Sequence, residues 1–214
     1  TLVNIKDTLQ THRVIVGRPK RKTPILSSKL TQVIFNPTWT VPPTILREDV
    51  IPAILKNRSY LTQTNIRLYD RNGKVVPASK WNLSNAYNYR YVQIPGTFNS
   101  LGMIKIVFPN RFSVYLHDTN HRDFFEKTER SLSSGCVRVD NPLELTEYLL
   151  NNPTRWNLEK ITKTLQNEKT EYATIKKNVL FHLLYWTSWS DKNRLIFRDD
   201  IYNLDAVLYK QLGN

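Results

Sequence analysis

Short runs of β-branched and aromatic residues, separated by turn-forming residues, recur along the chain. Residues 14–17 and 33–35 are two such runs, and each predicts a strand. Residues 103–108 have the alternation of a strand, and residues 113–116 form a further run after a turn at Pro109. The short connection predicts that these last two strands pair as a hairpin.

Three segments carry helical signals. Residues 48–56 have apolar positions at helical spacing, and Asn141-Pro142 predicts the start of a second helix, because proline fits the first helical position. Asn157 is the predicted N-cap of a third helix. Residues 179–189 are apolar and aromatic, and they predict a long buried strand. The order of strands, then helices, then a strand predicts a β-rich α+β fold.

The composition changes between about residue 44 and residue 96. This stretch is polar, aromatic and rich in turns, with Asp-Arg-Asn-Gly at residues 70–73 and tyrosines at alternate positions from 87 to 91. It predicts an inserted subdomain or lid, although a longer loop region of the same domain fits the pattern too. Trp39 lies just before it, between prolines that prevent a helix, as either a packed anchor or the wall of a site.

The chain is strongly basic. Its 31 lysines and arginines exceed its 18 acidic residues, which gives a net charge of +13. Such an excess favours contact with nucleic acid, anionic lipid or acidic cell-wall polymers, but a solvated basic surface would account for it equally well. No stretch approaches the roughly 18 apolar residues of a membrane span. Because the sequence starts at Thr1 and its only methionine is Met103, we expect a processed product or a fragment whose signal or anchor lies elsewhere.

The only cysteine, Cys136, follows Ser133-Ser134-Gly135. Glycine at this position allows a sharp backbone turn and the close approach of a substrate carbonyl. Successive backbone N–H groups in such a turn can stabilise an oxyanion. Arg138 adds positive charge that favours the thiolate. A single cysteine excludes an internal disulfide, and in an exported chain it is unusual unless it has a function.

A thiol needs a base before it attacks a carbonyl. Of the four histidines, His117 is the best candidate, because it ends a predicted strand from which an imidazole can be aimed. Tyr115 and Asp118 flank it, and either could orient its ring. The residues alone leave three interpretations open: an inert cysteine with a structural histidine, a metal site, and Cys–His nucleophilic catalysis.

The metal site would use His117, His121 and Cys136 as zinc ligands. Two histidines four residues apart share a face only in a helix, and residues 118–120 between them are poor helix formers. The glutamate of a zincin-type motif is also absent from the sequence. The pattern therefore disfavours a metal.

The segment from His117 to Arg138 resembles the motif of the YkuD family of L,D-transpeptidases, which is a histidine, a spacer, Ser/Thr-His-Gly-Cys, an apolar residue and Asn or Arg. Ser134 stands where many members have a second histidine, a difference familiar in the YcbB-like branch, which has a large inserted capping subdomain. One departure is that only residues 6–13 stand where the family usually has a hairpin. Further agreement in the family's order is found at residues 14–19, 23–24, 36–37, 39, 41–43, 99–102 and 200–203.

The resemblance implies a β-rich α+β catalytic domain of mixed sheets over residues 1–214, with a capping subdomain at about 44–96. The implied reaction is acyl transfer on peptidoglycan: a tetrapeptide stem loses D-alanine, and a cross-link forms between two third-position diamino acids. No metal or organic cofactor is implied. The implied site consists of Cys136 as nucleophile, His117 as general base and acid, Gly135, Ser134, Arg138, Tyr115 and Asp118 as supporting residues, and Trp39 in the substrate groove.

The implied partners are donor and acceptor stem peptides, with carbapenem β-lactams as covalent inhibitors and no nucleic acid. The implied location is the periplasm or cell envelope, with any membrane anchor in the full-length protein outside this chain. Two alternatives stay open. A catalytically inactive wall-binding module would need no reactive thiol, and a basic binder of single-stranded nucleic acid would use the charge and the tyrosines, although no nucleic-acid motif is recognised.

Overall fold

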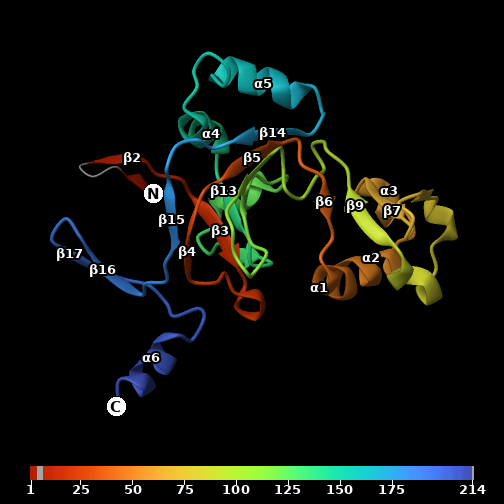
Figure 1. Ribbon diagram of the computed structural model, residues 1–214. Coiled ribbons are helices and arrows are strands. Elements are labelled where there is room, and N and C mark those ends of the chain that lie inside the picture. Colours follow the sequence, from red (N-terminus) through yellow and green to blue (C-terminus); the bar gives the residue numbers. More distant parts are fainter. Residues whose placement is uncertain (4–6, 214) are drawn as a thin grey trace.

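The computed structural model describes residues 1–3 and 7–213, and its main element is a seven-stranded mixed sheet (Figure 1). The strand order is β12-β3-β13-β11-β10-β5-β14. β11 and β13 are parallel, as are β12 and β3, and the other neighbours are antiparallel. The strands are β3 (Val14–Gly17), β5 (Gln32–Phe35), β10 (Ile104–Val107), β11 (Leu116–His117), β12 (Ser131–Ser133), β13 (Val137–Val139) and β14 (Glu171–Thr174).

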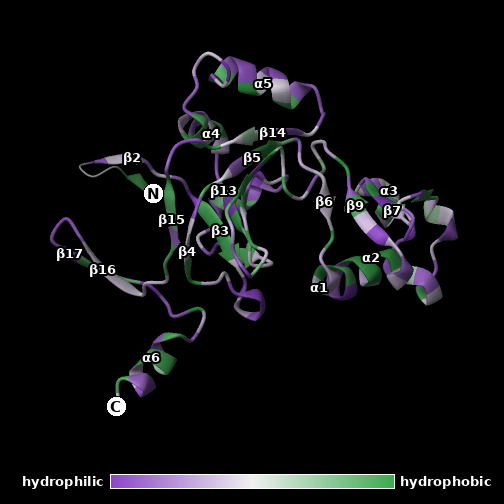
Figure 2. Ribbon diagram, in the orientation of Figure 1, coloured by the Kyte–Doolittle hydropathy of each residue, from purple (hydrophilic) through white to green (hydrophobic). Residues whose placement is uncertain are grey.

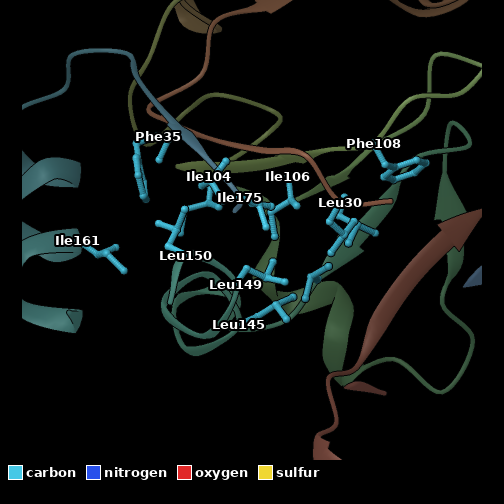
Figure 3. Close-up of a cluster of buried hydrophobic side chains, with 14 of the residues drawn as sticks. Leu30, Phe35, Ile104, Ile106, Phe108, Leu145, Leu149, Leu150, Ile161 and Ile175 are labelled. Carbon is cyan, nitrogen blue, oxygen red and sulfur yellow. The ribbon is translucent and has the colours of Figure 1, made fainter. Parts of the chain in front are cut away.

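One face of this sheet is apolar and packs on two helices, α4 (Pro142–Leu150) and α5 (Leu158–Gln166). Figure 3 shows Leu149 and Leu150 of α4 beside Ile104 and Ile106 of β10. Because side chains alternate along a strand, every second residue reaches this core. The strand residues in it are Val33, Phe35, Ile104, Ile106, Leu116, Val137, Val139 and Ala173.

The two helices begin where the sequence predicts. Pro142 occupies the start of α4, and Asn141 before it has a left-handed φ of 47°. The Asn157 side chain accepts a hydrogen bond from the Lys160 N–H at 2.9 Å, so the predicted N-cap of α5 is confirmed. The strand predictions for residues 14–17, 33–35 and 103–108 are also confirmed. The strand predicted at residues 113–116 is wrong for residues 113–115: the neighbour of β10 is β11 (Leu116–His117), although its predicted antiparallel pairing with β10 is confirmed.

A second, smaller sheet is formed within residues 39–93, called here the small-sheet region, which lies to one side of the main sheet (Figure 1). It has its own hydrophobic cluster, separate from that of the main sheet. The helix predicted over residues 48–56 is found as a π-helical turn, η2 (Leu46–Val50), continued by α2 (Ile51–Lys56). The remaining elements are β6 (Trp39–Thr40), α1 (Pro43–Ile45), α3 (Tyr60–Gln63), β7 (Ile66–Tyr69), β8 (Val75–Val76), η3 (Ala78–Lys80), η4 (Leu83–Asn88) and β9 (Arg90–Gln93).

The long buried strand predicted at residues 179–189 is wrong. The segment forms two strands, β15 (Leu180–Leu183) and β16 (Ser188–Asp191), with Leu180 66% and Trp186 63% exposed. β15 pairs only with β4 (Leu26–Lys29), and β16 forms a hairpin with β17 (Arg194–Phe197) that projects from the main sheet (Figure 1). Apolar composition predicted burial of the whole segment, but only Val179, Phe181 and Leu183 pack against the main core, and they are only partly buried.

The chain ends are peripheral. The last helix is α6 (Asp205–Gln211), and Figure 2 shows that hydrophobic residues occur there as well as in the central strands. At the other end, β1 (Leu2–Val3) pairs with β2 (Thr8–Gln10). The shortened connection expected over residues 6–13 lies partly outside the described residues. Two short 3-10 turns, η1 (Pro19–Arg21) and η5 (Arg122–Glu126), lie in the loops beside the main sheet.

Candidate active site

The face of the main sheet opposite the core carries the polar residues of the candidate site. Lys105 of β10 and Arg138 of β13 are both paired in register with His117 on the strand between them. The Val137 N–H donates to the Tyr115 carbonyl at 3.1 Å, which places Tyr115 beside Cys136 one row further along. Because alternate residues share a face, these side chains stand together while their neighbours fill the core.

The turn between β12 and β13 holds the cysteine in a defined conformation. Gly135 has a φ of +114°, which residues with a side chain rarely adopt. The Gly135 carbonyl accepts from Thr23 Oγ1 at 2.9 Å. Buried Ser133 donates from Oγ to the Cys136 carbonyl at 2.6 Å and accepts from the Gly135 N–H at 3.1 Å. Thr23 and Ser133 thus have a positioning function that the sequence analysis did not assign.

These contacts also distinguish the two backbone donors expected at an oxyanion site. The Gly135 N–H is occupied by Ser133, at 3.1 Å. Within the described residues, the Cys136 N–H has no hydrogen-bond acceptor. Cys136 N–H is therefore the backbone donor that remains available at this turn.

The ring of His117 is oriented by a backbone carbonyl. Its Nδ1 lies 2.5 Å from the carbonyl oxygen of Asp118, and the side chain is buried. A carbonyl only accepts, so Nδ1 carries the hydrogen and Nε2 keeps the lone pair. Burial first, then the charges of Arg138 and Lys105, lower the pKa of His117 to about 3. The imidazole is therefore neutral at pH 7 and can act as a base.

The thiol of Cys136 is held in its neutral form. Burial raises its pKa, while hydrogen bonding from Tyr115 and the charges of Lys105 and Arg138 act in the opposite direction. Arg138 therefore lowers the pKa of the thiol, which is the expected direction, but the increase caused by desolvation is larger. Cys136 lies two residues before Arg138, the register partner of His117 on the parallel neighbouring strand, and so on the same face of the sheet as His117. The pair is a neutral thiol beside a neutral base.

Trp39 and Tyr115 extend the site toward the small-sheet region. The Tyr115 ring lies edge-on to the His117 ring, with centroids 5.7 Å apart. Burial raises the pKa of Tyr115, the neighbouring Cys136 acts in the same direction, and Trp39 acts against it.

The carboxylate of Asp118 does not orient His117. It accepts from the Met103 N–H at 3.0 Å and from Arg122 at 2.8 Å, and burial raises its pKa. Gly102 has a φ of +60°, and a Cβ there would lie 2.4 Å from the Asp118 carboxylate. Asp118 thus acts through its carbonyl, and its side chain fixes the turn before β10.

Ser134 is linked to the small-sheet region by an arginine. Arg21 Nη1 donates to Ser134 Oγ at 2.9 Å and to Asp49 at 2.6 Å, and Nη2 donates to Glu48 at 2.6 Å. The Arg21 side chain is only 10% exposed. The sequence analysis missed this network, because its members are far apart in the chain.

The metal alternative finds no support in the geometry. Among residues 1–3 and 7–213, no group of three or more His, Cys, Asp or Glu side chains is placed to hold a metal ion. His121 instead stacks on Phe124, with ring centroids 5.1 Å apart, and its side chain is 56% exposed.

Comparison with known proteins places this arrangement in a family. Residues 1–166 match the YkuD family, described as the L,D-transpeptidase catalytic domain. The chain is 36% identical over 205 residues to a Haemophilus influenzae protein named "Putative L,D-transpeptidase". That match covers 94% of this chain and 42% of the relative, so the chain spans less than half of the relative's length. The chain belongs to the YkuD family of L,D-transpeptidase catalytic domains.

The family assignment confirms the resemblance in the sequence at the level of the domain. No helix in the described part of the chain is both long and apolar enough to cross a membrane.

Proposed function

We propose that the chain is the catalytic domain of a peptidoglycan L,D-transpeptidase in the cell envelope, with Cys136 as nucleophile and His117 as base. The observation that carries this proposal is the neutral His117, which keeps Nε2 as a base because the Asp118 carbonyl occupies Nδ1 at 2.5 Å. The chain's membership of the YkuD family supplies the substrate class, the peptide stems of peptidoglycan.

The first half-reaction forms a thioester. His117 Nε2 takes the thiol proton while the Cys136 sulfur attacks the carbonyl that joins the third-position diamino acid to D-alanine. The Cys136 N–H stabilises the oxyanion, and the Tyr115 hydroxyl stabilises the developing charge on sulfur. The C–N bond then breaks, and the proton on His117 passes to the departing amine of D-alanine.

The second half-reaction transfers the acyl group. The side-chain amine of an acceptor stem attacks the thioester and gives up a proton to His117, which passes it to the sulfur of Cys136 as the C–S bond breaks. The product is an amide between two third-position diamino acids. A carbapenem would acylate the same sulfur through its strained lactam carbonyl.

The small-sheet region has the position of a cap in this proposal. Trp39 on β6 interacts with the side chain of Tyr115, and Glu48 and Asp49 are held by Arg21 next to Ser134. A cap over residues 44–96 would exclude water from the thioester and so favour transfer over hydrolysis.

The test is intact mass after incubation with a carbapenem, on the wild type and on Cys136→Ala. We expect one adduct on the wild type and none on the variant, since Cys136 is the only cysteine. Release of D-alanine from a tetrapeptide stem by the wild type alone then identifies the reaction. A folded wild type that forms no adduct and releases no D-alanine would refute the enzyme and favour a wall-binding module.

A further inference from the structure

Two cations stand on either side of the candidate base. Lys105 and Arg138 are the register partners of His117 on its two neighbouring strands. Adjacent strands are about 4.8 Å apart, so the two Cα atoms are separated by roughly 10 Å with His117 between them. Both side chains are longer than the imidazole, so both can reach past it to whatever binds there.

Neither cation is neutralised by the protein. Within the described residues, no carboxylate forms an ion pair with Lys105 or Arg138. The nearest buried acid, Asp118, is paired with Arg122 at 2.8 Å. The other titratable groups beside the two cations are His117, Tyr115 and Cys136, all neutral at pH 7.

The contacts of the two cations are weak. Lys105 Nζ lies 3.8 Å above the centroid of the Tyr115 ring. Arg138 donates to Thr119 Oγ1 at 3.4 Å and lies 5.8 Å from the Phe124 ring, and its Nε is buried without a hydrogen-bond partner. Buried donors and charges are costly unless a partner satisfies them. The arrangement therefore calls for an anion that the chain itself does not provide.

We propose that Lys105 and Arg138 form a carboxylate-binding subsite that holds the free carboxylate of the leaving D-amino acid. This rests on the proposed acyl transfer, in which D-alanine departs from the carbonyl attacked by Cys136. Its carboxylate lies one residue beyond the scissile bond, and so falls beside His117, between the two cations. Guanidinium and ammonium groups bind carboxylates by charge-assisted hydrogen bonds, and Arg138 Nε would gain its missing acceptor.

A first experiment tests the anion preference without any transpeptidase substrate. Cys136 is alkylated with iodoacetate, which is anionic, or iodoacetamide, which is neutral; both form a thioether and release iodide. The ratio of the two rates cancels changes in thiol reactivity. We expect Lys105→Gln and Arg138→Gln each to lower the iodoacetate-to-iodoacetamide ratio roughly three- to tenfold.

Two further variants serve as controls. Lys80→Gln removes the same charge from an exposed lysine of the small-sheet region and should leave the ratio unchanged. Arg138→Lys keeps the positive charge and should retain most of the preference for iodoacetate. It can still be measured if Arg138→Gln does not fold. Ratios in Lys105→Gln and Arg138→Gln equal to that of the wild type would overturn the subsite, and so would an unchanged ratio in Lys105→Gln alone if Arg138→Gln does not fold.

A second experiment connects the subsite to the donor. A stem ending in D-alanine is compared with one ending in D-alaninamide. We expect the wild type to prefer the free acid through KM, and Lys105→Gln to reduce the ratio of acid to amide cleavage roughly three- to tenfold, whatever its absolute rate on either stem. If D-alanine is released but the acid–amide preference is the same in both proteins, the proposal is wrong.

The two experiments separate the proposals. An anion preference that depends on Lys105 in a protein that releases no D-alanine would support a carboxylate subsite and refute the proposed reaction. Release of D-alanine that does not depend on Lys105 or Arg138 would support the proposed reaction and refute the carboxylate subsite.

Discussion

Two tryptophan–tyrosine pairs in this molecule have different surroundings. In the small-sheet region, Trp81 Nε1 donates to Tyr91 Oη at 2.5 Å, and Tyr91 donates to the Ala86 carbonyl at 2.8 Å. At the candidate site, the side chain of Tyr115 interacts with those of Trp39 and Cys136, and each of these interactions shifts its pKa.

The difference between the pairs lies in the partner of the tyrosine. In the first pair the tyrosine hydroxyl donates to a carbonyl, so the polar groups of that pair are hydrogen-bonded inside a hydrophobic cluster. In the second pair the tyrosine interacts with a sulfur, next to a neutral base and two unpaired cations. The residue types therefore do not distinguish a structural pair from a reactive one, whereas the partner of the tyrosine does.

The largest effect is expected from removing His117, the proposed base. His117→Gln should slow carbapenem acylation roughly 10²- to 10⁴-fold, because no group then takes the thiol proton. The measurement is the rate of adduct formation by intact mass. An acylation rate within a few-fold of the wild type would assign the base to another residue.

The two tyrosines can be compared directly by removing each hydroxyl. Tyr91→Phe should lower the free energy of unfolding by about 1–3 kcal/mol, because Trp81 Nε1 and the Ala86 carbonyl lose a buried partner. Tyr115→Phe should slow acylation roughly tenfold, by removing a hydrogen bond to the sulfur. The measurements are denaturant unfolding and acylation rates on both variants. If Tyr91→Phe slowed acylation as much as Tyr115→Phe, the proposed difference between the two pairs would be wrong.

The neutral His117 predicts a dependence of stability on pH. Its pKa is about 3 in the folded chain, against an ordinary value of 6.5 for histidine, so between these values the unfolded chain binds the extra proton. Stability from this group is full above pH 6.5 and decreases as the pH falls toward 3. From pH 6.5 to pH 5 the loss should be roughly 1–2 kcal/mol. Urea unfolding at both pH values should give this loss in the wild type and a smaller one in His117→Gln.

The smallest effect is expected where the two regions are joined. Arg21→Gln removes ion pairs to Glu48 and Asp49 and the contact with Ser134, and it should slow acylation a few-fold without unfolding the protein. Arg13→Gln is a matched control, because Arg13 pairs with Glu126 and Asp140 away from the turn that holds the cysteine. Equal acylation rates in the two variants would mean that the link between the regions has no bearing on the site.

Local signals predicted much of the fold. Strands of the main sheet, the proline at the start of α4 and the Asn157 cap of α5 depend on residues near one another in sequence. The prediction of a buried strand at residues 179–189 failed because burial depends on what packs against a segment: Phe181 and Leu183 contact the main core, whereas Leu180 and Trp186 are exposed. The idea that residues 44–96 form a cap stays a prediction.

Cys136 and His117 were identifiable from sequence because a turn after Ser-Ser-Gly and a histidine at a strand end are local patterns. Other features of the site were not identifiable from the sequence. These are the hydrogen bond between His117 and the Asp118 carbonyl, the hydrogen bond from Arg21 to Ser134, and the position of Lys105 beside His117. Each of these depends on strand register or on a side-chain direction. Only the packed sheet sets those, since it brings residues tens of positions apart in sequence onto one polar face.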